Sequence, residues 1–275
     1  MIDEKTYRTL MKDKDKIVVK IGTSTLSFAS GRLNLQRIEQ MAGILSTLRK
    51  KGKKIILVSS GAIGVGAGRL GLTAKPDEMS MKQALASIGQ AELMKIYQRF
   101  FERHDQMIAQ VLLTKDVMTD PGKNINAKNT LNTLMDMQII PVINENDTIS
   151  TDEILFGDND TLSANVATLV KADMLVMLSD IDGLYSSNPK EDPNATIISY
   201  VDEISPSLES IAAGSGSSFG TGGMVTKIIA ARICSEAGID SVITNGKDPA
   251  VLYRLIQGEQ VGTLFIAGDA KKLAN

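Results

Sequence analysis

Short apolar runs alternate with longer amphipathic stretches along most of this chain. The apolar runs are rich in Ile, Val and Leu, as strands are when both faces of a sheet are covered; they lie at 17–19, 55–58, 107–113, 139–143, 174–178, 241–244 and 263–266. Between them, apolar residues recur at the spacing of a helix face, in the stretches 34–51, 81–102, 126–137, 160–171 and 225–237. Strands alternating with helices of this length predict an α/β fold with a mainly parallel central sheet.

Single residues indicate where these elements begin, end or become irregular. Asn34 is a residue type that caps helix N-termini, and Gly52 stands where a helix-ending glycine belongs. Gly89 predicts a break in the long helix 81–102, since glycine is a poor helix former. Pro141 predicts an irregular position in its strand, because proline cannot donate to a sheet ladder.

The composition excludes several classes of function. The net charge of −2 gives no electrostatic reason to bind nucleic acid or a membrane surface. No run of about 18 apolar residues is present to span a membrane, and the charged N-terminus lacks a secretory signal, so we expect a cytoplasmic protein. The single cysteine, Cys234, excludes an intramolecular disulfide and is expected to be packed as a small hydrophobe. With His104 as the one histidine, a multi-histidine metal site is excluded, and we predict no metal-ligand set.

Polar residues that directly follow strands are the candidates for function, because ligands of open α/β sheets bind outside the carboxyl ends of the strands. The first such segment is Lys20-Ile21-Gly22-Thr23-Ser24. A lysine followed by glycine and two hydroxyls offers a positive charge and a close backbone approach, which suit a phosphate. The alternative is a surface lysine before a turn.

A second candidate is the glycine-rich segment 59–68, whose backbone amides are able to converge on an anion. It overlaps a literal G-x-G-x-x-G at Gly66, Gly68 and Gly71, the pattern of a dinucleotide site. In that motif the glycines open a helix directly after the strand. Here the triplet begins seven positions beyond Ser59, so the dinucleotide interpretation is weak.

Two polar clusters, 144–147 and 157–160, lie within one loop and the start of a helix. Carboxylates this close together repel one another unless they bind cations. The candidate cations are an ammonium group, a magnesium ion or a catalytic lysine. The alternative for Asp160 is to cap the helix that follows it. A calcium loop fits poorly, because the regular alternation of oxygen ligands is missing.

The last candidate segment, 221–227, leads from glycines into a helix and carries Lys227 within its first turns. Helix N-termini attract phosphate, although the segment is not a P-loop. A positive charge near a helix N-terminus is unfavourable for the helix, which argues against a purely structural Lys227. Two lysines, glycine-rich turns and a carboxylate cluster together indicate phosphoryl transfer, which depends on positioning and charge neutralisation.

These segments resemble the amino acid kinase family, and within it the glutamate 5-kinases. Order and spacing agree in Val18-Val19-Lys20-Ile21-Gly22-Thr23-Ser24, Ser59-Ser60-Gly61-Ala62-Ile63, Asn144-Glu145-Asn146-Asp147, Gly157-Asp158-Asn159-Asp160, Ser179-Asp180-Ile181-Asp182-Gly183-Leu184-Tyr185 and Thr221-Gly222-Gly223-Met224-Val225-Thr226-Lys227. Acetylglutamate kinases carry paired glycines after the lysine, where this chain has Gly22-Thr23-Ser24, which favours the glutamate 5-kinase branch. Family members commonly have threonine at the position of Ser179, which keeps the hydroxyl.

The resemblance implies a three-layer α/β/α sandwich forming a single domain over residues 1–275. The C-terminal domain similar to RNA-binding modules that many glutamate 5-kinases carry is expected to be absent. The implied reaction transfers phosphate from ATP, with Mg²⁺, to the γ-carboxylate of L-glutamate. Its product, γ-glutamyl phosphate, is the first intermediate of proline synthesis.

The resemblance also implies roles for individual residues. Lys20 and Lys227 are expected to neutralise the phosphates, with Asp158 and Asp160 orienting these lysines or the amino group of the substrate. The residues expected to bind the substrate are Ser60, Gly61, Asp147 and Asn159. Those expected to lie against the nucleotide are Lys20, Gly22, Ser179, Asp180, Thr221, Gly222, Gly223, Met224, Val225, Thr226 and Lys227.

The partners that the resemblance implies are a second copy of the chain in a homo-oligomer, proline as a feedback inhibitor, and glutamate-5-semialdehyde dehydrogenase as the enzyme that receives the product by channelling. Two alternatives stay open. One is an enzyme of the same fold that acts on another small carboxylate or on carbamate. The other is a non-catalytic amino acid sensor, which would have no need of both Lys20 and Lys227.

Overall fold

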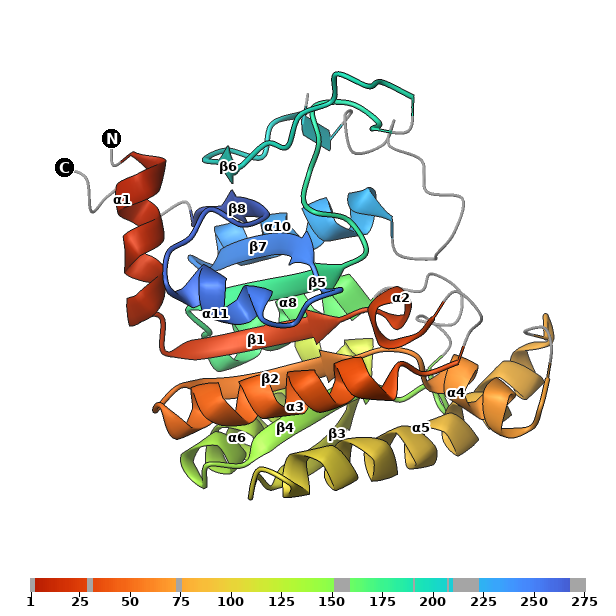
Figure 1. Ribbon diagram of the computed structural model, residues 1–275. Helices are drawn as coiled ribbons and strands as arrows, with labels where there is room; N and C mark the ends of the chain where they lie inside the picture. The colour runs from red at the N-terminus through yellow and green to blue at the C-terminus, as the bar shows by residue number, and fades with distance from the viewer. Residues whose placement is uncertain are drawn as a thin grey trace.

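The computed structural model describes residues 3–28, 32–72, 76–150, 159–189, 191–206, 208–209 and 223–267. Their centre is an eight-stranded sheet in the order β3-β4-β2-β1-β5-β7-β8-β6 (Figure 1). The strands are β1 (Lys16–Ile21), β2 (Lys54–Ser59), β3 (Ile108–Leu113), β4 (Ile140–Glu145), β5 (Met174–Ser179), β6 (Tyr200–Val201), β7 (Asp240–Asn245) and β8 (Thr263–Phe265). Neighbouring strands are parallel except for the antiparallel pair of β7 and β8. The predicted mainly parallel sheet is therefore confirmed.

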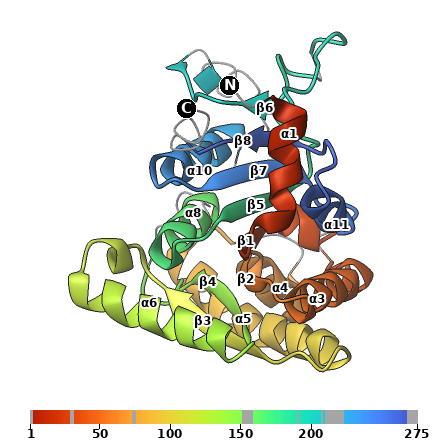
Figure 2. The same cartoon turned by 90° about the vertical axis from the view of Figure 1, so that its left-hand side faces the viewer.

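Helices cover both faces of the sheet (Figure 2). One buried apolar cluster joins the sheet to α1 (Glu4–Thr9), α3 (Leu35–Lys50), α5 (Met79–Glu102) and α11 (Val251–Ile256). The other joins it to α6 (Pro121–Asp136), α8 (Asn159–Val170) and α10 (Met224–Glu236). Residues of β1 alternate between the two clusters, since Ile17 and Val19 belong to the first and Val18 to the second. This burial on both sides explains the continuous apolar run and confirms the three-layer sandwich.

The boundary residues behave as expected at both ends of α3. The Asn34 side chain accepts a hydrogen bond of 3.0 Å from the backbone N–H of Arg37, and Gly52 adopts a positive φ of 94° just past the helix. Helix α6 begins before the predicted stretch, because Asp120 caps it and Pro121 occupies its first turn. The sequence interpretation missed the short helices α1, α2 (Thr23–Leu26), α4 (Ala62–Arg69) and α11 and the strand β6, which have too few residues for a clear periodicity.

The predicted break near Gly89 is wrong, because α5 runs without interruption from Met79 to Glu102. Gly89 is instead the point where α5 crosses α4 (Ala62–Arg69), and a Cβ atom there would lie 1.7 Å from the carbonyl oxygen of Ala62. A Cβ atom on Gly66 of α4 would lie 2.0 Å from the carbonyl oxygen of Leu85. The two glycines therefore let the helix backbones touch, and Gly66 of the apparent dinucleotide motif serves this packing.

We expect Gly66→Ala to lower the free energy of unfolding by about 2 kcal/mol or more, because the added methyl group must push the two helices apart. The matched control is Gly68→Ala in the same helix, where a Cβ atom would meet nothing within 4 Å. That change should be neutral or stabilising by up to about 1 kcal/mol, since alanine is the better helix former. Urea denaturation of both variants measures the difference, and equal stabilities would contradict the close crossing.

Candidate active site

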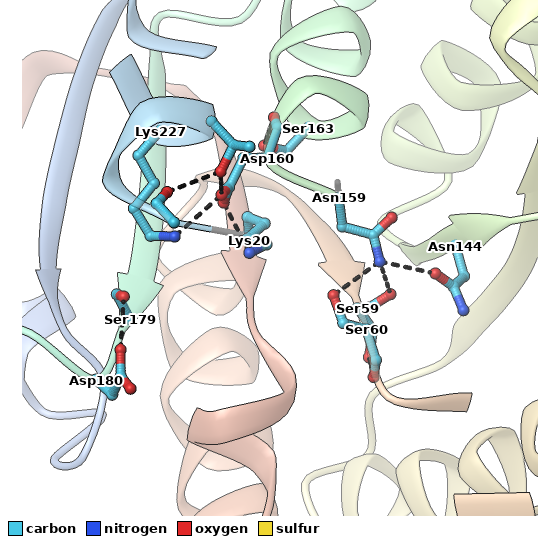
Figure 3. Close-up of polar contacts among 12 residues, drawn as sticks. Lys20, Ser59, Ser60, Asn144, Asn159, Asp160, Ser163, Ser179, Asp180 and Lys227 are labelled. Atoms are coloured by element: carbon cyan, nitrogen blue, oxygen red, sulfur yellow. Dashed lines mark hydrogen bonds and ion pairs between the residues drawn. The ribbon is translucent and has the colours of Figure 1, made fainter. Parts of the chain in front are cut away.

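The candidate residues gather where β1, β2, β4 and β5 end and where α8 and α10 begin (Figure 3). Because parallel strands present their carboxyl ends at one edge of a sheet, segments distant in sequence meet there. Lys20 lies at the end of β1, Ser60 follows β2, and Asn159 and Asp160 open α8. Lys227 lies in the first turns of α10.

Asp160 is the shared partner of the two lysines. Its Oδ1 lies 2.7 Å from Nζ of Lys20, and its Oδ2 lies 3.0 Å from Nζ of Lys227 (Figure 3). The hydroxyl of Thr226 donates a further hydrogen bond of 2.8 Å to Oδ2. The side chains of Lys20, Lys227 and Asp160 are all buried. Asp160, at the start of α8, thus contacts the end of β1 and the start of α10. Its role therefore goes beyond capping α8.

The charges around Asp160 decide its protonation state. Burial by itself would raise the pKa of this carboxyl, but the ammonium groups of Lys20 and Lys227 outweigh that effect and lower the pKa to about 2. The carboxylate is therefore ionised at neutral pH. The three side chains together carry a charge of +1 in a buried setting, where electrostatic attraction for an anion such as phosphate is strong.

Asn159 is the centre of a second, uncharged group (Figure 3). Its Nδ2 lies 2.7 Å from Oγ of Ser60, 3.1 Å from Oδ1 of Asn144 and 3.2 Å from the carbonyl oxygen of Ser59. All four residues are buried. Asn159 and Asp160 are consecutive, yet Figure 3 shows their side chains pointing to opposite sides. The start of α8 therefore joins the uncharged group to the lysine pair.

Asp147 follows β4 and is 5% exposed. Its Oδ1 is buried and has no hydrogen-bond partner among the residues that the structure describes. Burial and the nearby charge of Glu145 raise the pKa of Asp147 to about 7. A buried carboxyl beside a second one is stabilised by a cation, so this position suits the binding of an ammonium group.

Two glycines bring the loops after β1 and β2 together. Gly61 has a φ of 100°, a conformation that favours glycine, and the position of its missing Cβ atom lies 3.7 Å from the side chain of Thr23. Gly22 begins the short helix α2 (Thr23–Leu26), and the position of its missing Cβ atom lies 3.5 Å from Nζ of Lys20. The loops after β1 and β2 therefore lie in van der Waals contact, and the backbone of Gly22 lies next to the ammonium group of Lys20.

The nucleotide candidates are only partly described. Ser179 ends β5 and donates a hydrogen bond of 3.2 Å to exposed Asp180. Gly223 precedes α10, Met224 and Thr226 lie in its first turn, and Val225 there is 43% exposed. Asp158, Thr221 and Gly222 lie outside the described residues.

Sequence interpretation missed Gln90 of α5 as part of this site. Its Oε1 lies 3.0 Å from Nδ2 of Asn144, and both side chains are buried. The available signal was a polar side chain on an apolar helix face, because Gln90 lies between Ala86 and Leu93 at helical spacing.

Within the described ranges, no group of three or more His, Cys, Asp or Glu side chains is arranged to hold a metal ion.

Cys234 is buried, as expected for a cysteine packed as a small hydrophobe, and burial raises the pKa of its thiol to about 12. Among the helices described, none has the length and apolar character needed to cross a bilayer.

Comparison with known proteins identifies the family. The pattern of the amino acid kinase family matches residues 15–245. The glutamate 5-kinase of Listeria innocua is 51% identical over 94% of this chain and 95% of its own length. That of Clostridium perfringens is 49% identical over 94% of this chain and 98% of its own length. The chain belongs to the amino acid kinase family, and within it to the glutamate 5-kinases.

Solved structures confirm the amino acid kinase fold. Carbamate kinase from Giardia lamblia, bound to AMP-PNP, matches with a TM-score of 0.66 and 17% identity over 93% of this chain and 99% of its own. UMP kinase from Bacillus anthracis matches with a TM-score of 0.60 and 16% identity over 92% of this chain and 96% of its own. At these identities the likeness concerns the fold alone.

The raised pKa of Asp147 makes stability depend on pH. The unfolded state releases this proton near pH 4 and the folded state near pH 7, so the group destabilises the folded state increasingly as pH rises between these values. Asp147→Asn removes the effect. We expect the stability of the variant relative to wild type to rise by about 2 kcal/mol from pH 5 to pH 8.

Urea denaturation at the two pH values measures this difference. The matched control is Asp136→Asn, which alters an exposed carboxylate paired with Lys54 at 2.7 Å. Lys54 lowers the pKa of Asp136, so that carboxylate is ionised at both pH values and its variant should show no such rise. A rise of equal size in both variants would contradict the environment described for Asp147.

Proposed function

We propose that this protein transfers the γ-phosphoryl group of ATP to the γ-carboxylate of L-glutamate, giving γ-glutamyl phosphate and ADP in the first step of proline biosynthesis. The observation that carries the proposal is the convergence of Lys20 and Lys227 on Asp160, next to the uncharged hydrogen-bonded pair of Ser60 and Asn159. Identity of about half to glutamate 5-kinases over nearly the whole chain supports the choice of glutamate.

Catalysis in this proposal is charge neutralisation and positioning. Phosphoryl transfer spreads negative charge over the transferring group, and preorganised cations stabilise it. Lys20 and Lys227 supply these cations, while Asp160 fixes the position of both ammonium groups at 2.7 and 3.0 Å. The backbone amides of Gly22, which lies next to the Lys20 ammonium group, and of Gly61 are proposed to approach the same charge.

ATP is proposed to lie against Ser179, Asp180 and the segment 221–227, whose described part opens α10. The carbamate kinase of the same fold is bound to AMP-PNP, which supports a nucleotide site. The described residues form no metal-ligand cluster, so we assign no protein ligands to Mg²⁺. Magnesium would accompany ATP on the phosphate oxygens and neutralise part of their charge.

Glutamate is proposed to bind next to the side chain of Asn159, which points away from the lysine pair (Figure 3). Buried Asp147 would receive the α-ammonium group, which suits a carboxyl without a partner among the described residues. Ser60 and Asn159 would hold the carboxylates. Asp158 keeps the role expected from the sequence, to orient the lysines or the amino group.

The rival substrates within this fold include carbamate and UMP, the substrates named for the two solved relatives. An acylated or absent amine has no need of a buried carboxyl, so the environment of Asp147 favours a free amino acid. A non-catalytic sensor would need no pair of lysines held at one carboxylate.

Further parts of the proposal follow from the family alone. They are a single domain over residues 1–275, a cytoplasmic location, a homo-oligomer, feedback inhibition by proline, and channelling of the product to glutamate-5-semialdehyde dehydrogenase. Proline shares the carboxylate and the cationic amine of glutamate, so the same pocket chemistry suits both.

The reaction itself is tested by trapping its product. We expect the purified protein to consume ATP only when glutamate is present and, with hydroxylamine, to form γ-glutamyl hydroxamate, because an acyl phosphate reacts with this nucleophile. Parallel reactions with N-acetylglutamate, aspartate and carbamate serve as controls. No hydroxamate from glutamate, with steady turnover of another acceptor, would overturn the assignment.

Replacing Lys227 tests the lysine pair. We expect Lys227→Ala to lower kcat by about 10² or more with a modest change in the glutamate KM, because the lost cation acts on the transition state. The matched control is Lys54→Ala, which breaks the exposed pair with Asp136 and should leave kcat unchanged. An unaltered kcat in folded Lys227→Ala would remove this residue from its role.

A further inference from the structure

Gln90 lies behind the candidate acceptor site and is hydrogen-bonded to it through Asn144. Its side chain comes from the middle of α5, is 9% exposed, and places Oε1 3.0 Å from Nδ2 of Asn144. The chain continues through Oδ1 of Asn144 to Nδ2 of Asn159, at 3.1 Å, and on to Oγ of Ser60, at 2.7 Å. Four buried side chains thus form one hydrogen-bonded relay, defined as Gln90, Asn144, Asn159 and Ser60.

The relay has a direction. Oε1 of Gln90 can only accept, so Asn144 must turn its Nδ2 toward it and its Oδ1 toward Asn159. Asn159 must then present its Nδ2 to that oxygen and to the carbonyl oxygen of Ser59, which also can only accept. The same Nδ2 lies 2.7 Å from Oγ of Ser60, so its two hydrogens are shared among three acceptors. Because Oγ of Ser60 faces this donor, the hydroxyl hydrogen of Ser60 is directed to another acceptor.

The position of Gln90 is fixed by its neighbour in sequence. Gly89 is the crossing point of α5 on α4, where a Cβ atom would lie 1.7 Å from the carbonyl oxygen of Ala62. Helix α4 begins directly after Gly61, in the same loop as Ser60. One end of the relay therefore lies on α5 and the other in the loop that opens α4, and the backbones of these two helices touch, which leaves little room for the relay to change its length.

We propose that Gln90 is a positioning residue that, through Asn144 and Asn159, helps to keep the Ser60 hydroxyl oriented as a hydrogen-bond donor to a carboxylate of the acceptor substrate. The inference rests on the proposed function, because it names glutamate as the ligand at Ser60. Without the Gln90 acceptor, Nδ2 of Asn144 loses its partner, the Asn144 amide is free to turn over, and its donor group then faces the donor group of Asn159. The two donor groups repel each other and shift Asn159 from the position in which its Nδ2 faces Ser60, although the carbonyl oxygen of Ser59 still accepts from that Nδ2.

The test compares variants at Gln90 by steady-state kinetics. Gln90→Met keeps the length of the side chain but removes the acceptor, and we expect it to raise the glutamate KM about tenfold, the effect of roughly one lost hydrogen bond. The KM for ATP and kcat should stay within about twofold of wild type. Gln90→Glu keeps an acceptor oxygen and should bring the glutamate KM back to within about threefold.

A purely structural role gives a different pattern. Loss of folded protein lowers the apparent kcat and leaves both KM values unchanged. The matched control is Gln98→Met on the exposed side of α5, where Gln98 bonds to Glu102; its glutamate KM should equal that of wild type. If Gln90→Met fails to fold, Gln90→Asn, which withdraws the carbonyl by one methylene, replaces it with the same expected rise. A folded Gln90→Met or Gln90→Asn variant with the wild-type glutamate KM, or with equal rises in both KM values, overturns the proposal.

The wild-type protein separates failure of the proposed function from failure of the Gln90 proposal. If the proposed function is wrong, wild type forms no hydroxamate from glutamate. The relay is still measured without substrate, by nitrogen-15 NMR of the Asn144 and Asn159 side-chain amides. We expect slow hydrogen exchange at both amides in wild type and faster exchange in Gln90→Met. Equal exchange in the two proteins overturns the relay itself.

Discussion

The contact of Asp160 with two lysines is the interaction on which the site depends. Three elements, β1, α8 and α10, must pack closely for Lys20 and Lys227 to reach one buried carboxylate. Removing three charged groups from water costs free energy that such contacts only partly offset, so buried ion pairs are weak sources of stability. A protein gains little folding free energy from this arrangement, and its value lies in a fixed, buried positive charge.

The start of α8 divides the site into two chemical environments. Asp160 faces the lysines, and Asn159, one residue earlier, faces Asn144 and Ser60 of the uncharged relay (Figure 3). On the proposed function, one helix end thus sets the position of both the phosphate side and the acceptor side. Because phosphoryl transfer depends on the alignment of the attacking and leaving oxygens, a shared rigid support is an effective way to position them.

The sequence predicted the parts of this structure that depend on local periodicity. The strands other than β6 and the helices α3, α5, α6, α8 and α10 follow from apolar spacing, and Asn34 and Gly52 marked the ends of α3 correctly. What it could not predict are contacts between segments distant in sequence. Gly89 suggested a helix break because its real role, the close crossing of α5 on Gly66 of α4, involves a helix that is distant in the sequence. The sequence interpretation overlooked Gln90 for the same reason, since its partner Asn144 follows a different strand.

Two buried aspartates show how environment decides the chemistry of one residue type. Asp160 has its pKa lowered to about 2 because two ammonium groups outweigh burial, whereas burial and Glu145 raise the pKa of Asp147 to about 7. Environments that push apart the pKa values of like groups indicate different roles. The positive charge needed at Asp160 is supplied by the chain itself. At Asp147 the described residues supply none, and an ammonium group arriving with the acceptor would complete the site by the same electrostatic rule. The acceptor side is therefore the part of the site whose charge balance depends on the ligand.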